Sequence, residues 1–167
     1  MIQLVVDSTA ALPKDFLADH ANIHVIPLFI SIKGEYVPEN EATIEQVIEY
    51  SESTKKAVST SQPSTGDFLK MFESIPAEDP IIVICLTSGV SGTYNGAVLA
   101  ARQSGRKNIS VINSRTTAVG MMEIVEDALE FIDKGLSFEE VGEKLLESAS
   151  LLRTTFTVPT LDYLRRG

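Results

Sequence analysis

Short apolar runs rich in valine and isoleucine alternate with longer amphipathic stretches along this chain. Several runs are apolar almost throughout, which is typical of strands that are covered on both faces of a parallel sheet. The runs that predict strands are Ile2–Val6, Ile23–Ile30, Ile81–Leu86, Ile109–Ile112 and Thr155–Val158. Their alternation with helical stretches predicts an α/β fold, with a mainly parallel sheet flanked by helices and joined by right-handed crossovers.

The stretches between these runs contain signals for where helices begin and end. A capping-box pattern, in its usual or a closely related form, occurs at Thr43–Gln46, Ser64–Asp67 and Ser137–Glu140. A further helix is predicted over Thr117–Lys134, because its apolar residues share one face and Gly135 provides a stop. The polar stretches Lys33–Asn40 and Lys55–Ser64 are expected to be loops.

Hydroxyl residues follow the predicted strands at the points where the strands end. The polar segments are Asp7-Ser8-Thr9, Thr87-Ser88, Ser91-Gly92-Thr93, Asn113–Thr117 and, after Val58, Ser59–Ser64. Loops that leave parallel strands meet at one edge of the sheet, so we expect a crevice rich in hydroxyl and backbone N–H donors, which favours an anion. Capping explains any single hydroxyl, and Ser91 or Thr93 is expected to cap a helix over Tyr94–Ser104. The clustering across several loops is what indicates a site.

Composition narrows the classes of partner. The net charge is −9, from 23 acidic and 14 basic residues, and the longest basic runs are pairs. A nucleic-acid partner is therefore not expected. No apolar run approaches the roughly 20 residues of a membrane span, and no signal peptide is recognisable. The single cysteine, Cys85, lies inside an apolar run and is interpreted as a buried structural thiol in a reducing cytoplasm.

The same loops lack the features of known catalytic motifs. Gly89 and Gly92 are too close together for a phosphate loop, which also needs a lysine, and the glycine spacing around Ser91 differs from that of a hydrolase elbow. His20 and His24 lie across a predicted helix-to-strand boundary, so they are expected neither to hold a metal nor to act as a base. We predict no catalytic residue, metal or cofactor, and a site that holds a ligand rather than converting it.

Six stretches also occur together, in this order, in a known family. They are VVDSTAALP (Val5–Pro13), VIPLFI with GEY downstream, TSQPSTGDF (Thr60–Phe68), TSGVSGTYNGA (Thr87–Ala97), VINSR (Val111–Arg115) and TLDYLRRG (Thr160–Gly167). On these stretches the chain resembles the DegV family of bacterial fatty-acid-binding proteins over nearly its full length. The resemblance implies a Rossmann-like layered domain that binds a long-chain fatty acid, is not an enzyme and presents the acid to a separate fatty-acid kinase.

The resemblance also implies which residues hold the ligand. Thr60 opens the T-S-Q-P-S motif and Ser91 belongs to the S-G-T motif; these two would bind the carboxylate, with backbone N–H support at Gly92. The expected pocket neighbours are Asp7, Ser8, Ser61, Ser88 and Ser114. Asn113 departs from the family pattern, which commonly has an aspartate there.

The family continues beyond the LRRG at which this sequence stops. We therefore expect an N-terminal α/β domain over residues 1–154, with residues 155–167 as the start of a second domain. The apolar surface that this leaves uncovered is expected to favour a homodimer. Two other functions remain open at this point: an enzyme that uses the serine and threonine loops on a phosphate or acyl substrate, and an interaction domain without a ligand.

Overall fold

The computed structural model describes residues 1–158 and 161 of the chain, and its contacts divide them into two compact units. Unit 1 comprises Met1–Ile26 and Pro63–Thr154, and unit 2 comprises Pro27–Gln62 with the described residues from Thr155 onward. The expected domain over residues 1–154 therefore includes residues of both units. That residues 155–167 begin a further domain stays a prediction, and most of the TLDYLRRG stretch lies outside the described residues.

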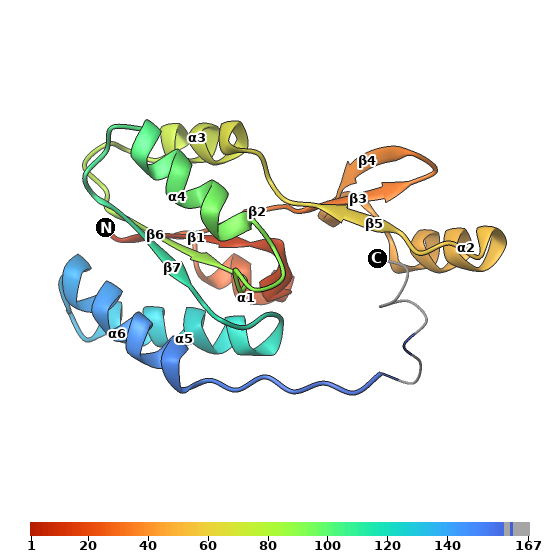
Figure 1. Ribbon diagram of the computed structural model, residues 1–167. Helices are drawn as coiled ribbons and strands as arrows, with labels where there is room; N and C mark the ends of the chain where they lie inside the picture. The colour runs from red at the N-terminus through yellow and green to blue at the C-terminus, as the bar shows by residue number, and fades with distance from the viewer. Residues whose placement is uncertain (159–160, 162–167) are drawn as a thin grey trace. The chain divides into compact units, whose positions relative to one another are not determined.

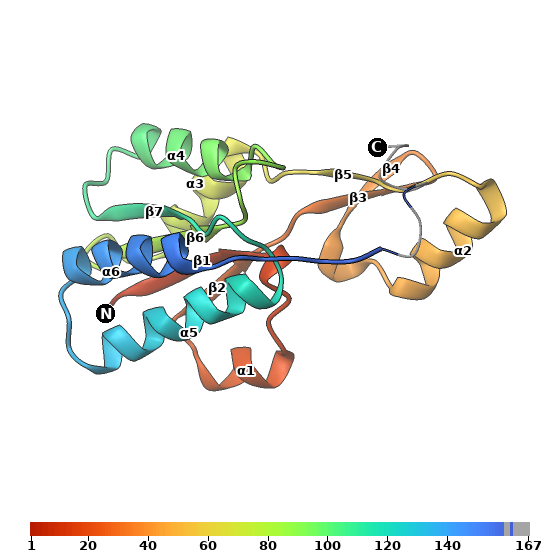
Figure 2. The same ribbon diagram turned by 60° about the horizontal axis from the view of Figure 1, so that its bottom comes forward.

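Unit 1 is built on a four-stranded sheet in which all neighbouring strands are parallel, as predicted (Figure 1). Its order is β2-β1-β6-β7, with bounds β1 (Gln3–Asp7), β2 (Ile23–Ile26), β6 (Ile81–Cys85) and β7 (Ile109–Asn113). The helical elements of this unit are η1 (Ser8–Ala10), α1 (Lys14–Asp19), α3 (Thr65–Ser74), α4 (Thr93–Gln103), α5 (Val119–Asp133) and α6 (Phe138–Leu151). Helices α3 and α4 cover one face of the sheet, and α5 and α6 cover the other (Figures 1 and 2).

Alternating side chains of the central strands fill two separate cores. Leu4 and Val6 of β1 pack in the cluster that includes α5 and α6, whereas Val5 packs in the cluster that includes α3 and α4. Every residue of β1 and of β6 is buried, since successive side chains point to opposite faces and both faces are covered. This double covering is why these strands are almost continuously apolar in the sequence.

The helix starts follow the local signals. All three expected capping boxes are present as reciprocal hydrogen bonds, at Thr43, Ser64 and Ser137. The bond from the Ser137 backbone N–H holds the pKa of the Glu140 carboxyl below its usual value. Helix α5 begins at Val119, two residues later than predicted, after Ala118 adopts a φ of 50°. Gly135 ends that helix with a φ of 77°, a conformation that costs glycine little.

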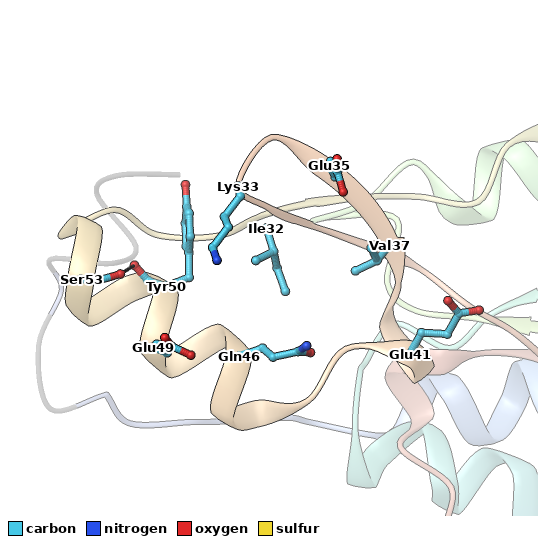
Figure 3. Close-up of a pocket in the computed structure, with 9 residues that line it drawn as sticks. All are labelled: Ile32, Lys33, Glu35, Val37, Glu41, Gln46, Glu49, Tyr50 and Ser53. Atoms are coloured by element: carbon cyan, nitrogen blue, oxygen red, sulfur yellow. Dashed lines mark hydrogen bonds between the residues drawn. The ribbon is translucent and has the colours of Figure 1, made fainter.

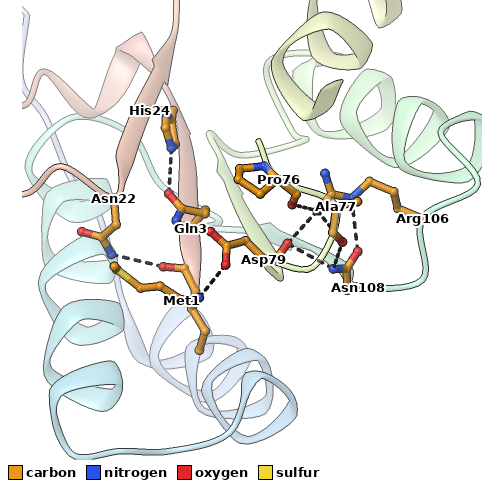
Figure 4. A network of polar contacts seen from close by, with 10 residues as sticks. Met1, Gln3, Asn22, His24, Pro76, Ala77, Asp79, Arg106 and Asn108 are labelled. Atoms are coloured by element: carbon orange, nitrogen blue, oxygen red, sulfur yellow. Dashed lines mark hydrogen bonds and ion pairs between the residues drawn. The ribbon is translucent and has the colours of Figure 1, made fainter. Parts of the chain in front are cut away.

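A network of polar contacts secures the segment between α3 and β6 (Figure 4). The Arg106 guanidinium donates to the backbone carbonyls of Phe72, Ile75, Pro76, Ala77 and Asp79. The Asp79 carboxylate accepts from the N-terminal ammonium at 2.6 Å and from Gln3 Nε2 at 2.9 Å. The Arg106 contacts thus give partners to backbone carbonyls in the last turn of α3 and in the segment that follows it, where the regular helical hydrogen bonds end.

Unit 2 contains a small antiparallel sheet in the order β4-β3-β5. Its elements are β3 (Phe29–Ile32), β4 (Glu35–Pro38), η2 (Glu39–Glu41), α2 (Ile44–Thr54) and β5 (Ser59–Ser61). Lys33 and Gly34 join β3 to β4 with φ angles of 56° and 89°. Two consecutive positive φ angles are the geometry that matches the twist of a two-residue hairpin.

The structure corrects four local expectations. The strand predicted over Ile23–Ile30 is two strands in different sheets, because Pro27 has no N–H for a strand ladder and the chain changes unit there. Half of the expected loop Lys33–Asn40 is strand β4, and the expected loop Lys55–Ser64 contains β5. Thr155–Val158 form no strand, since no partner strand pairs with them among the described residues.

Candidate functional site

The loops that leave β1, β6 and β7 are bound to one another at the carboxyl edge of the unit 1 sheet. Leu86 N donates to Asp7 Oδ2 at 2.7 Å, which joins the β6 loop to the end of β1. Thr87 N donates to Thr116 O at 2.9 Å, which joins the β6 loop to the β7 loop. The gathering of these hydroxyl-rich loops at one edge, expected from the sequence, is therefore present within unit 1.

Two of the expected pocket neighbours point into the protein. Asp7 is 1% exposed, and its carboxylate also accepts from the backbone N–H and the hydroxyl of Thr9. Ser114 is fully buried, and its hydroxyl donates to Thr116 O and accepts from Thr116 N. These contacts order the edge loops. Contact of either side chain with a ligand stays a prediction, as it does for the half-buried Ser8 in η1.

The backbone amides of the β6 loop fall into two groups. The N–H groups of residues 86–90 all have acceptors: Asp7 Oδ2, Thr116 O, Asn113 Oδ1, Thr87 Oγ1 and Thr87 O, in order. Among the hydrogen bonds of the described residues, none uses the N–H groups of Ser91 and Gly92, which come next. The first five amides thus bind the loop to the ends of β1 and β7 and to its own Thr87, whereas the next two have no acceptor among the described residues.

Ser91 and Gly92 lead directly into α4. Gly92 is the N-cap, so the expected cap by Ser91 or Thr93 is wrong at that position. Ser91, the residue before the N-cap, contacts the first residue of the helix instead. Its Oγ accepts from Thr93 N at 3.3 Å and lies 2.9 Å from Thr93 Oγ1. The first N–H groups of a helix lack intrahelical acceptors and carry the positive end of the helix dipole. Arg115 adds the only charged side chain of the 86–92 and 114–118 loops.

None of the described residues forms a nucleophile–base pair with Ser91, because its hydroxyl is hydrogen-bonded to Thr93 alone. His20 Nδ1 instead lies 2.7 Å from Phe16 O, and His24 Nε2 lies 2.9 Å from Gln3 Oε1. Cys85 is buried as predicted, and burial, followed by the charge of Asp7, raises the pKa of its thiol. A thiol of that kind is a weak nucleophile.

Thr60 and Ser61 belong to unit 2, on β5, where Thr60 is paired with Ile30 of β3. The Thr60 side chain is exposed, and its hydroxyl is used by no hydrogen bond among the described residues. The expected site residues therefore fall into two sets. Asp7, Ser8, Ser88, Ser91, Gly92 and Ser114 share the carboxyl edge of unit 1, and Thr60 and Ser61 share one strand of unit 2.

Unit 2 has a pocket of about 370 Å³ between the β3–β4 hairpin and α2, which the sequence analysis missed (Figure 3). Its lining mixes apolar and charged side chains: Ile32, Lys33, Glu35, Val37, Glu41, Gln46, Glu49, Tyr50 and Ser53. None of the expected site residues lines it. The Lys33-Gly34 turn is the signal that could have indicated the hairpin, and with it this pocket.

A family model described as "Uncharacterised protein, DegV family" matches residues 1–167. The chain belongs to the DegV family. A DegV domain-containing protein of Staphylococcus aureus is 35% identical over 166 residues, which is 98% of this chain and 58% of that protein. A DegV domain-containing protein of Caldanaerobacter subterraneus is 32% identical over 99% of this chain and 59% of its own length. This DegV chain thus spans somewhat more than half the length of these relatives.

Solved structures of DegV proteins share the fold. A structure described as fatty acid binding of a DegV family protein from Thermus thermophilus has a TM-score of 0.81 and 26% identity, over 89% of this chain and 53% of that one. DegV from Bacillus subtilis, described as a fatty acid binding protein, has a TM-score of 0.78 and 30% identity, over 89% and 54%. A stearic acid-binding protein from Eubacterium ventriosum has a TM-score of 0.77 and 28% identity, over 87% and 52%. In the described part of this DegV chain, no helix is both long and apolar enough to cross a bilayer.

Proposed function

We propose that this chain binds the carboxylate end of a long-chain fatty acid without catalysing a reaction on it. Ser91 and the Gly92 amide bind the carboxylate from unit 1, and Thr60 binds it from unit 2. The bound acid is then presented to a separate fatty-acid kinase, and the chain pairs with a second copy through its uncovered apolar surface. The observation on which the proposal rests is the pair of unused amides at Ser91 and Gly92, at the start of α4, in a fold shared with fatty-acid-binding proteins.

The chemistry of that loop suits a carboxylate head. A carboxylate only accepts hydrogen bonds, and a helix start with two further backbone donors supplies groups that only donate. Each hydrogen bond to a charged group contributes about 1.5–3 kcal/mol. The edge loops contribute a positive side chain, Arg115, while their one carboxylate, Asp7, is buried in contacts with the protein. Local recognition of an anion is therefore compatible with a net charge of −9.

The acyl tail supplies most of the affinity in this proposal. Burying a dozen methylene groups at about 0.8 kcal/mol each gives on the order of 10 kcal/mol before the costs of association. Head-group contacts of a few kilocalories then determine which end of the ligand is held and how it is oriented. Removal of the Thr60 and Ser91 hydroxyls, which contact the head group in this proposal, should accordingly weaken fatty-acid loading and leave the protein folded.

Native mass spectrometry of the purified chain, with lipid extraction of the same sample, tests the proposal directly. We expect a co-purified acyl ligand with the mass of a long-chain fatty acid, and lower occupancy in Thr60→Ala with Ser91→Ala. The matched control is Ser150→Ala, which removes an exposed hydroxyl that donates to Glu147 O within α6. Chain that stays empty in excess oleic acid contradicts the function; unchanged occupancy in the double variant contradicts only the residue assignment.

Two further measurements test the transfer of the acid to the kinase and the formation of a homodimer. Loaded chain, a fatty-acid kinase and ATP should yield an acyl phosphate, and chain without kinase should yield none. In the native mass spectrum, we expect a species with twice the mass of the chain if the homodimer forms. Ester or phosphate turnover by the chain alone, lost in Ser91→Ala, would instead support the enzyme alternative.

A further inference from the structure

Helix α2 of unit 2 carries an exposed apolar pair on the side that faces away from the pocket between α2 and the β3–β4 hairpin. Gln46, Tyr50 and Ser53 line that pocket, at spacings that place them on one face of the helix (Figure 3). Ile44 and Ile48 each lie two residues earlier, which is a rotation of about 200° around the helix axis. They are 74% and 50% exposed, so the described residues leave this face largely uncovered.

The charges around α2 are separated along its axis. Glu41 and Glu45 lie at its amino end, in η2 and in the first turn, and Lys55 and Lys56 follow its last residue. All four side chains are exposed. This order suits the helix dipole, which favours acidic groups at the amino end and basic groups at the carboxyl end. It also makes the helix complementary in charge to a second copy of itself that runs in the opposite direction.

We propose that two copies of the chain pair through this face of α2, with the two helices antiparallel about a twofold axis near Ile48. The inference rests on the homodimer of the proposed function and names the surface that forms it. Antiparallel pairing packs Ile44 and Ile48 of one copy against the same residues of the other. It also brings the acidic amino end of each helix beside the basic carboxyl end of the other, whereas parallel pairing would place like charges together.

The size of the surface limits the strength of the dimer. Complexes that bury less than about 1,200 Å² in total are weak or transient, and one helix face with a single apolar pair belongs to that class. We therefore expect a dimer that dissociates on dilution. Because both copies use the same face, the assembly closes at two chains and does not continue to higher oligomers.

Sedimentation velocity of the whole chain at concentrations from about 5 µM to about 500 µM measures the monomer–dimer equilibrium. We expect Ile44→Ser with Ile48→Ser to raise the dissociation constant at least about tenfold. The matched control is Leu146→Ser, which removes an apolar side chain that is 54% exposed on α6 of unit 1 and should leave the equilibrium unchanged. Urea unfolding midpoints verify that each variant is folded.

Charge reversal tests the antiparallel arrangement. One variant carries Lys55→Glu with Lys56→Glu, so both ends of its α2 are acidic. The other carries Glu41→Lys with Glu45→Lys, so both ends are basic. Each variant should dimerise more weakly than wild type, because like charges then meet at both ends of the interface. An equimolar mixture of the two should form a heterodimer, since every acidic end then meets a basic one.

The outcomes separate the surface from the rest of the proposed function. A wild-type chain that is monomeric at every concentration overturns both the homodimer and this inference, and leaves the face to a different protein. A dimer that survives Ile44→Ser with Ile48→Ser forms elsewhere, which overturns the inference alone. Charge variants that dimerise as wild type does, or a mixture without heterodimer, overturn it as well. Fatty-acid loading of wild type is measured independently of all these results.

Discussion

Asp7 ends β1 with a carboxylate that is almost completely buried and satisfied by the protein itself. It accepts from Leu86 N across the sheet edge and from Thr9 N and Oγ1 in its own loop. A polar residue directly after a buried strand is typical both of a ligand site and of an internal loop anchor. The contacts of Asp7 are those of an anchor, which holds the β6 loop in the conformation that leaves two amides unused.

Asp7→Asn should lower the free energy of unfolding by about 1–3 kcal/mol. One of the two carboxylate oxygens becomes an NH₂ group, which would face a backbone N–H and leave a buried donor without an acceptor. Urea unfolding followed by circular dichroism measures the change. The matched control is Asp19→Asn on the exposed end of α1, which also removes one carboxylate and should stay within about 0.5 kcal/mol of wild type. Equal stability of the two variants would contradict the anchor role.

His24 gives the stability of unit 1 a dependence on pH. Partial burial lowers the pKa of His24 below its usual value of 6.5. The unfolded chain therefore binds more protons at this site than the folded chain does. The stability it contributes is present above pH 6.5 and is lost as the pH falls through the lower pKa of the folded state.

We expect the urea midpoint of wild type to fall further between pH 7.5 and pH 5 than that of His24→Gln. Glutamine does not titrate, and its amide can still donate to Gln3 Oε1, the partner of His24. Urea titrations of both proteins at the two pH values measure the difference. Parallel midpoints for the two proteins would show that His24 does not contribute to this dependence.

At the scale of elements, the start of α5 packs so closely against Thr116 that only glycine fits at position 120, although glycine has a low helix propensity. Gly120 lies in its first turn, and a Cβ there would collide with Thr116 Oγ1 and come 3.1 Å from Thr116 Cβ. Thr116 is buried, and its backbone carbonyl accepts from Thr87 N of the β6 loop. The glycine thus lets α5 begin directly against the loop that supports the candidate site.

Gly120→Ala should destabilise the protein by about 1–3 kcal/mol, although alanine is the better helix former. The added methyl group would displace Thr116 as a whole, because its Cβ as well as its hydroxyl is in the way. Gly66→Ala is the matched control, since its new Cβ would meet only Ser64 Oγ at an ordinary 3.5 Å in the first turn of α3. That variant should be neutral or more stable by up to about 1 kcal/mol. Thermal unfolding of both variants gives the comparison.

At the scale of the whole molecule, every residue of the two hydrophobic cores belongs to unit 1. Unit 2 has a three-stranded sheet whose middle strand β3 is only half-buried, and a helix without buried residues. The two units therefore differ in how much apolar burial stabilises them. Unit 1 has the burial of an independently stable domain.

Replacement of residues 27–62 by a Gly-Ser linker of about eight residues should leave unit 1 folded. The linker would connect Ile26 to Pro63, the two points where the chain changes unit. We expect a helical circular-dichroism spectrum and a single cooperative urea transition, because both cores remain complete. The shortened chain should load less fatty acid, since Thr60 is removed with unit 2. Loss of cooperative unfolding would show that unit 1 depends on unit 2.

The sequence by itself determined those features whose physical cause is local. Side-chain periodicity and continuous apolar runs predicted β1, β6 and β7 as covered parallel strands, and the capping boxes at Thr43, Ser64 and Ser137 depend on residues only three positions apart. The motif order was enough to predict the family, and the hydroxyl residues after the strands were enough to predict the edge at which they gather.

Tertiary structure decided what depends on partners far apart in the sequence. Pro27 marks a break within the run Ile23–Ile30, but only the fold decides that its halves pair in different sheets, β2 with β1 and β3 with β4 and β5. Asp7 and Leu86, like Asn113 and Ser88, meet only after the sheet has formed. Which amides of the β6 loop stay free follows from those contacts. Burial and long-range hydrogen bonding assign each polar group its partner, and short-range pattern contains no information about that assignment.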